Sequence, residues 1–245
     1  MATKKKMDFD RSKPTIVVEN KSTLVTDAFV KRMIAGLQAQ IDEDFFPAWG
    51  LTARLVFKAA PPFEHMGLVI KDSSDEAGDL GYHFREGYPV AYVFAKDSMS
   101  DGAGIGGLTS TVSHEILEMI ADPGVNLLAA QPPPEKSRRA TRLFSYEVCD
   151  PVEANSYRKK GVSVSNFVLP EWFEPEHKPR EMKMDFLGVV DSPFELAPGG
   201  YVDMFKNGKW KTLWGPEAKK KPASARHRLN ARKAKRSVTR TSANS

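Results

Sequence analysis

The segment Leu108–Ala121 reads LTSTVSHEILEMIA and runs directly into Asp122-Pro123. Its apolar residues recur at helical spacing, which predicts a helix that ends near the proline, because the residue before a proline disfavours helical backbone angles. On a helix, side chains four residues apart share one face, so the His114 imidazole and the Glu118 carboxylate converge while Glu115 projects beside them. Our expectations for the rest of the chain start from this arrangement.

A histidine and a carboxylate on one helical turn are typical of a metal-ligand pair, and an intervening glutamate can take the proton of a metal-activated water. The stretch resembles the His-Glu-x-x-His motif of zinc peptidases, with a glutamate at the second histidine position. The alternative is an ordinary solvated helix face, in which apolar side chains such as Val112, Ile116 and Met119 turn inward and the polar ones meet water.

A second acidic cluster lies downstream, in Tyr146-Glu147-Val148-Cys149-Asp150-Pro151-Val152-Glu153. Its three carboxylates stand three residues apart in a segment apolar enough to be partly buried, and buried carboxylates need a cation or hydrogen-bond donors. We therefore predict a metal site with His114 and Glu118 as ligands, completed by Glu147 or Asp150, and with Glu115 as the catalytic general base.

Three nearby features leave alternatives open. Cys149 is the only cysteine, which excludes an internal disulfide, and its setting favours a small core residue over a nucleophile. Asp122 is either a further ligand or a cap at the helix end. The glycines of Asp97–Gly107 favour a sharp turn into the helix over a nucleotide-binding loop, because their spacing matches neither phosphate-binding fingerprint.

The pattern of the other segments predicts an α+β protein. A long amphipathic helix is expected from Thr26 or Asp27 to Pro47, because apolar residues recur at helical spacing after a good N-cap. β-Branched and alternating residues predict further extended segments. These are Thr15–Glu19, Leu51–Lys58, Met66–Lys71, Pro89–Ala95, Phe144–Val148 and Val162–Leu169, with a short extended piece at Gly81–Phe84 in an otherwise loop-like region and a hairpin at Asn207-Gly208.

This order of elements resembles the N-terminal half of metzincin-type zinc peptidases, in which a twisted sheet backs an active-site helix and an edge strand lines the substrate cleft. The resemblance implies a zincin-like mixed sheet backed by the long helix and the His-Glu helix, followed by a β-rich C-terminal part. It also implies a groove beside Val90–Phe94. The chain departs from the metzincin pattern because the third histidine and a clear Met-turn are absent.

The chain is also similar to a group of uncharacterised bacterial and phage proteins. The similarity lies in SHExxEMxxDP (residues 113–123), in YEVCDPVE (residues 146–153) and in FVLPxWF (residues 167–173). The same group shares the motif QxQ at Gln38 and Gln40 and the motif FPxWG at 46–50. These motifs imply a shared site without naming a reaction.

The charge of the chain is unevenly distributed. Ten of the 36 basic residues and none of the 31 acidic residues lie in Ala218–Ser245, so 26 basic and 31 acidic residues precede that segment. A basic segment without aromatic residues has too little apolar surface to fold alone, which predicts a disordered tail. The tail would bind nucleic acid or another polyanion, or serve only solubility.

Taken together, the sequence predicts a flexible segment 1–12, one metallopeptidase-like domain over 13–216 and a disordered basic tail over 217–245. The expected function is metal-dependent hydrolysis of a peptide or protein substrate. Zinc is the first expectation for the ion, with calcium and manganese as alternatives because carboxylate ligands favour harder ions. The alternative function is a non-catalytic, metal-stabilised structural or binding protein, phage-associated, that contacts nucleic acid through its tail.

The sequence also bears on localisation. It shows neither a secretory signal nor an apolar run long enough to span a membrane, so we expect a cytoplasmic or virion-associated protein without membrane partners. The oligomeric state does not follow from the sequence.

Overall fold

The structure is a computed structural model that describes residues 13–58, 66–74, 80–100, 103–135, 137 and 139–217. Segment 1–12 and, apart from Glu217, the basic tail lie outside the described residues. The elements are, in chain order, β1 (Thr15–Asn20), α1 (Asp27–Gln40), the π-helical turn η1 (Ile41–Phe45), α2 (Phe46–Trp49), β2 (Arg54–Phe57), β3 (Met66–Lys71), β4 (Gly81–Glu86), β5 (Tyr88–Phe94), α3 (Ala95–Ser100), α4 (Ile105–Ala121), β6 (Leu128–Gln131), β7 (Arg142–Ser145), the 3-10 turn η2 (Asp150–Val152), β8 (Ser156–Lys159), β9 (Val162–Ser165), the 3-10 turn η3 (Pro170–Phe173), β10 (Tyr201–Lys206) and β11 (Lys209–Trp214).

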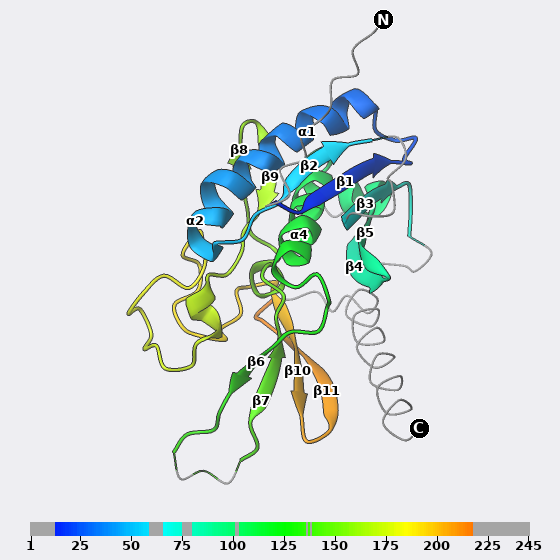
Figure 1. Cartoon of the computed structure of the whole chain (residues 1–245). Coiled ribbons are helices and arrows are strands. Elements are labelled where there is room, and N and C mark those ends of the chain that lie inside the picture. The colour runs from blue at the N-terminus through cyan, green and yellow to red at the C-terminus, as the bar shows by residue number, and fades with distance from the viewer. Residues whose placement is uncertain are drawn as a thin grey trace, which may run out of the picture.

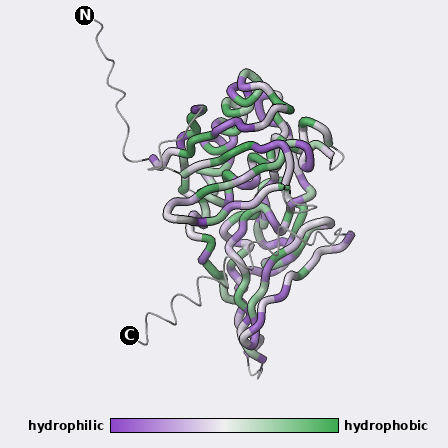
Figure 2. Tube along the Cα trace, turned by 90° about the vertical axis from the view of Figure 1, so that its right-hand side faces the viewer, coloured by the Kyte–Doolittle hydropathy of each residue, from purple (hydrophilic) through white to green (hydrophobic). Residues whose placement is uncertain are grey.

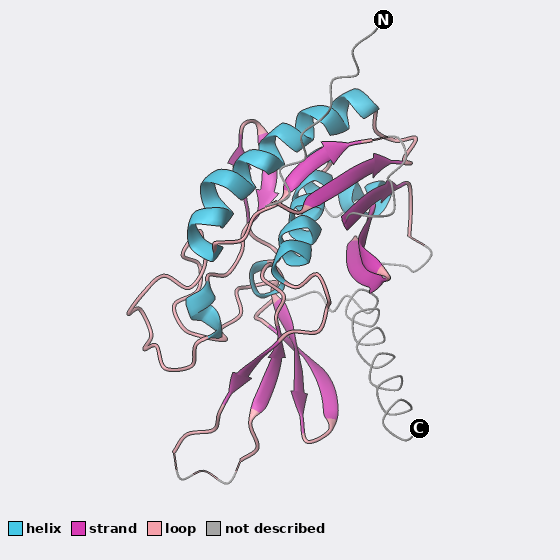
Figure 3. Ribbon diagram, in the orientation of Figure 1, coloured by secondary structure: helices cyan, strands magenta, loops and turns pink. Residues whose placement is uncertain are grey.

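The main sheet is mixed and has the strand order β2-β1-β3-β5-β4. The neighbours β2, β1, β3 and β5 pair in parallel, whereas β4 pairs antiparallel with β5 and forms one edge of the sheet. A smaller antiparallel sheet, ordered β11-β10-β7-β6, projects from the opposite end of the molecule to α1 (Figure 1). The ribbon in Figure 3 shows the two long helices, α1 and α4, lying beside the main sheet. The predicted α+β class, with a mixed sheet and a β-rich C-terminal part, is confirmed.

One face of the main sheet forms the core. Side chains alternate across a strand, and Ile16 and Val18 of β1 share a buried cluster with Val30 and Met33 of α1 and with Val112 of α4. Figure 2 shows hydrophobic stretches running through this upper body of the molecule. Because both helices bury their apolar sides against the sheet, the motif-bearing helix α4 is held deep in the protein.

The long predicted helix is present, with a change of pitch. The Thr26 hydroxyl accepts a hydrogen bond from the backbone N–H of Phe29, as an N-cap should, and α1 starts at Asp27. The turn η1 follows, and Pro47 stands in the first turn of α2, where its missing N–H costs little. Gly50 ends the run in the left-handed conformation (φ 64°).

The region before α4 is more regular than expected. The predicted loop Asp97–Gly107 contains most of α3, and α4 begins at Ile105, where Gly104 takes a positive φ of 56°. A Cβ at Gly107 would lie 2.3 Å from the Ser98 carbonyl oxygen, so the glycine lets the two helices approach closely. The glycines therefore serve the turn into α4, but they do so between two helices.

Other predicted segments agree in type and differ in length. The strand predicted at Leu51–Lys58 is reduced to β2, and neither β6 nor β8 was predicted. The predicted hairpin is confirmed, with Asn207 and Gly208 at positive φ (49° and 79°) between β10 and β11. None of the helices in the described part of the chain is long and apolar enough to cross a membrane.

Candidate metal centre

The polar residues of α4 face the protein interior. His114, Glu115 and Glu118 are 6%, 1% and 0% exposed, because α4 packs against β5 and β4 on one side and against β9 on another. The Nε2 atom of His114 lies 3.2 Å from Oε1 of Glu118, one helical turn away. The alternative of a solvated helix face is therefore wrong.

The second acidic segment reaches the same place. It follows β7 and enters η2, where Oδ1 of Asp150 lies 3.1 Å from Nε2 of His114. The backbone N–H groups of Cys149 and Asp150 each donate to Oε1 of Glu118 over 3.2 Å. The structure thus brings together the two segments that the sequence singled out, although 31 residues separate Glu118 from Cys149.

A third segment, which sequence reasoning did not assign to the site, contributes His83. In β4, His83 pairs with Ala91 of β5 and shares its core-facing side. Its Nδ1 atom lies 3.3 Å from Oε2 of Glu115 and 3.7 Å from Oε2 of Glu118, and its Nε2 atom lies 3.6 Å from Oε2 of Glu147. His83 is 1% exposed, so the edge strand delivers an imidazole to the middle of the acidic cluster.

The side chains form two overlapping groups that could hold a metal ion. His114, Glu118 and Cys149 offer one ligand atom each within 4.8 Å of one another, and so do His83, Glu118 and Glu147. Three of the four predicted ligands, His114, Glu118 and Glu147, belong to these groups. The fourth, Asp150, adjoins them through its contact with His114. The residues that the sequence did not assign to the site are His83 and Cys149.

The electrostatics of the cluster favour cationic partners. Burial by itself lowers the pKa of His114, but the neighbouring carboxylates of Glu118 and Asp150 outweigh it and hold the pKa well above its ordinary value. The pKa of His83 is raised for the same reason, with Glu147 and Glu115 opposing the effect of burial. Burial raises the pKa of the Cys149 thiol, and Glu118 adds to the effect. A divalent ion would compensate the charge of the same carboxylates that raise the pKa of the two imidazoles.

A pocket of about 310 Å³ gives access to one side of this cluster. His114 and Glu115 line it, whereas Glu118, Glu147 and Asp150 do not. The other lining residues are mostly small. They include Gly81, Ala103, Gly106, Gly107, Ser110, Ala154 and Gly199. None of the residues Val90–Phe94 of the predicted groove lines this pocket, which borders Gly81 at the start of the edge strand β4.

Glu115 stands between the buried cluster and the pocket. Its Oε2 atom contacts His83, while a Cβ built at Gly81 would lie 3.1 Å from its Oε1 atom. A larger residue at position 81 would therefore crowd this oxygen. The carboxylate can orient His83 and face the pocket at the same time, so the predicted base has a geometry that suits proton transfer.

Asp122 has a structural partner outside the ligand groups. Its backbone N–H donates to the carbonyl of Glu118 over 2.7 Å, and its Oδ2 atom accepts from the backbone N–H of Leu127 over 2.9 Å. Of the two alternatives for this residue, the cap at the end of α4 is the one that these contacts support.

A buried hydrogen-bond network ties α4 to its neighbours. The Ser113 hydroxyl donates to Oε1 of Gln40 over 2.6 Å, and Nε2 of Gln40 donates to the carbonyl of Ser165 over 2.8 Å. The backbone N–H of Ser165 donates back to the Ser113 hydroxyl over 3.0 Å. Through these hydrogen bonds Ser113, which precedes His114, joins α1, α4 and β9 beside the site.

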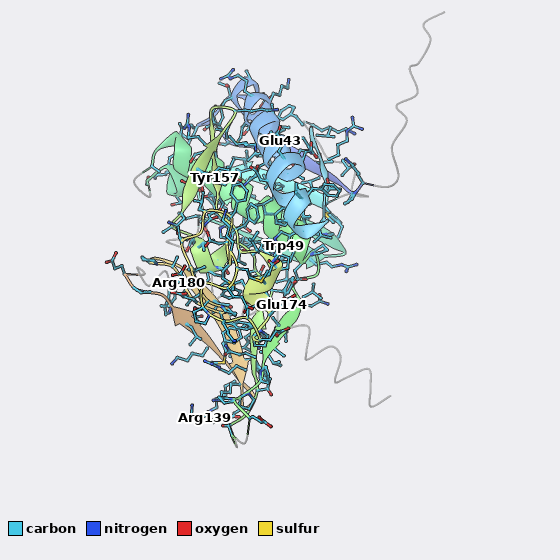
Figure 4. The ribbon with its side chains drawn as sticks, turned by 90° about the vertical axis from the view of Figure 1, so that its left-hand side faces the viewer. Glu43, Trp49, Arg139, Tyr157, Glu174 and Arg180 are labelled. Carbon is cyan, nitrogen blue, oxygen red and sulfur yellow. The ribbon has the colours of Figure 1, made fainter. Side chains whose placement is uncertain are left out.

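Aromatic packing holds the second acidic segment. The ring of Tyr146, next to Glu147, stacks on Phe173 at 4.2 Å and meets Trp49 edge-on at 5.7 Å. Trp49 lies at the end of α2 and is labelled in Figure 4, as is Glu174, which follows η3. The indole N–H of Trp49 donates to the carbonyl of Val168 over 3.0 Å. The motif FVLPxWF therefore serves the core rather than a cleft.

Comparison of the chain with family models, with curated proteins and with solved structures finds no match. The function is therefore argued from the site.

Proposed function

We propose that the protein is a metal-dependent hydrolase of peptide-like amides, in which His114 and Glu118 hold the ion together with residues of the segments around His83 and Glu147. The observation that carries the proposal is the convergence of ligand atoms from α4, β4 and the segment after β7 beside a pocket that reaches His114 and Glu115. Ligands from separate elements hold an ion in a defined position, as catalysis requires.

The residues fit a divalent ion. The Nε2 atom of His83 is buried and has no hydrogen-bond partner among the described residues, although it lies within 3.6 Å of a carboxylate oxygen. A buried polar atom of this kind is satisfied by coordination, and buried carboxylates are satisfied by a cation. The mixture of imidazole, carboxylate and thiol favours zinc, while manganese and calcium compete through the carboxylates.

A bound ion would polarise the substrate carbonyl and acidify a water molecule. Glu115 would take a proton from the attacking water as its oxygen adds to the carbonyl carbon, and would return the proton to the leaving nitrogen as the C–N bond breaks. The pocket volume of about 310 Å³ and its small lining side chains suit a short segment of extended peptide.

The test combines metal analysis with a peptidase screen of the full chain. Wild-type protein should retain a stoichiometric divalent ion and cleave at least one peptide of a mixed library. Glu115→Gln should keep the ion and lose cleavage by roughly a hundredfold or more, as expected for a lost general base. Glu174→Gln, which changes an exposed carboxylate paired with His177, is the matched control and should behave like wild type.

A second candidate function is that of a non-catalytic protein in which the ion only joins α4 to the later segment. The near-complete burial of the cluster favours it, because a structural ion needs no open coordination position. Bound metal without cleavage of any peptide or ester would support this candidate over the first. Nucleic-acid binding by the basic tail would be a property of residues outside the described part of the chain.

A further inference from the structure

Glu118 occupies the centre of the cluster and belongs to both groups of ligand atoms. Its Oε1 atom lies 3.2 Å from Nε2 of His114, and its Oε2 atom lies 3.7 Å from Nδ1 of His83. The two oxygens of one carboxylate thus face two imidazoles that come from different elements, α4 and β4. With one oxygen near each imidazole, this carboxylate is placed to serve both groups of ligand atoms.

The negative charge of the cluster exceeds the charge that one divalent ion can compensate. Four carboxylates, from Glu115, Glu118, Glu147 and Asp150, are each at most 1% exposed. When ionised they carry four negative charges, of which one divalent ion compensates only half. Coordination by Cys149 as a thiolate would increase the excess. Burying uncompensated charge is costly, so a pair of divalent ions suits this site better than a single ion.

The second observation concerns His83. Its Nε2 atom lies 3.6 Å from Oε2 of Glu147 and forms no hydrogen bond within the described residues. An ion held by His114 and Cys149 would leave this imidazole and Glu147 without a function in binding. A second ion would use both.

We propose that the centre is dinuclear. Glu118 bridges two divalent ions, one held by His114 and Cys149 beside Asp150, the other held by His83 and Glu147. The proposal rests on the metal binding put forward above and extends it to a second ion. The Oε2 atom of Glu115 lies 3.3 Å from Nδ1 of His83, so the proposed general base adjoins the second metal position.

For the test, the full chain is first stripped of metal with a chelator. It is then titrated with Zn²⁺ in competition with a second, chromophoric chelator. We expect two Zn²⁺ per wild-type chain and one per His83→Ala chain. The matched control is His177→Ala, which removes another histidine paired with a glutamate, at 2.7 Å from Oε2 of Glu174. This variant should still bind two. Circular dichroism checks that each variant is folded.

A measurement on wild type alone avoids dependence on the folding of variants. Protein loaded with Mn²⁺ should give the electron paramagnetic resonance spectrum of an exchange-coupled pair, because a bridging carboxylate couples neighbouring ions. One Zn²⁺ per chain together with an uncoupled Mn²⁺ spectrum overturns the dinuclear centre and leaves the proposed hydrolase standing. Absence of stoichiometric metal overturns both proposals.

Discussion

Two buried regions of the protein are built in opposite ways. Around Trp172, aromatic rings fill the interior, with Phe173 at 4.8 Å and Phe194 at 5.3 Å between ring centroids. Around Glu118, equally buried side chains carry charge, and carboxylates outnumber imidazoles. The aromatic region is satisfied by ring packing and by the hydrogen bond from the Trp172 indole to the Glu195 carbonyl, whereas the acidic region depends on the protons or ions that it holds. The comparison teaches that equal burial can give opposite responses to solution conditions.

The largest effect should come from the aromatic region. Trp172→Ala removes a fully buried indole and leaves a cavity, which should lower the free energy of unfolding by about 3–5 kcal/mol. Urea denaturation of the variant and of wild type, each with and without chelator, measures this loss. A loss that changes with chelator would show that the two regions are energetically coupled, contrary to the comparison.

Metal removal should act on the acidic region alone and nearly as strongly. An ion present at a hundred to a thousand times its dissociation constant stabilises the folded state by roughly 2.7–4.1 kcal/mol, so a chelator should lower the melting temperature of wild type. Glu118→Gln should lose this response, because the change removes the carboxylate that both groups of ligand atoms share.

Differential scanning calorimetry of both proteins, with Zn²⁺ and with chelator, provides the measurement. A Glu118→Gln variant that keeps the full response to Zn²⁺ would exclude Glu118 as a ligand.

The pH dependence of stability should reverse between the two metal states. The pKa of His114 is raised in the folded state, so the metal-free protein gains stability from its protonation below the unfolded pKa of about 6.5 and loses it as the pH rises through the folded pKa. Metal binding requires the neutral imidazole, so the stabilisation by Zn²⁺ should grow over the same range. Melting curves at a series of pH values above about 6.5 measure both trends. Parallel trends with and without Zn²⁺ would exclude His114 as a ligand.

The smallest effect should come from the wall of the pocket. In Gly81→Ala the new Cβ would lie 3.1 Å from Oε1 of Glu115 and 3.1 Å from the Tyr92 carbonyl oxygen, so its neighbours must shift by a few tenths of an ångström. We expect a several-fold fall in turnover with little change in bound metal. Steady-state kinetics beside metal analysis would check this, with Gly67→Ala in β3 as the control for a glycine change, because a Cβ built there meets nothing within 4 Å. If Gly81→Ala lost metal, this position would affect the arrangement of the metal-binding residues rather than that of Glu115 alone.

Much of the fold and part of the site follow from local patterns. Helical spacing and an N-cap placed α1, and the Asn-Gly pair placed the β10–β11 hairpin, because backbone conformation at these positions depends on nearby residues. The shared face of His114 and Glu118 follows from helix geometry alone. His83 could have been found only from its alternation with Tyr82 and Phe84, which puts it on the opposite face of β4 from the two aromatic residues.

The sequence by itself determined the secondary elements around the motif, the clustering of acidic residues in two segments and the convergence of side chains on one turn of α4. These depend on periodicity within a few residues. Only the tertiary structure decided that β4 is the edge strand, that His83 enters the cluster from it, and that Glu118 lies between two sets of ligand atoms. Strand order and the packing of α4 against β4, β5 and β9 depend on contacts between residues far apart in the chain, and no local pattern encodes them.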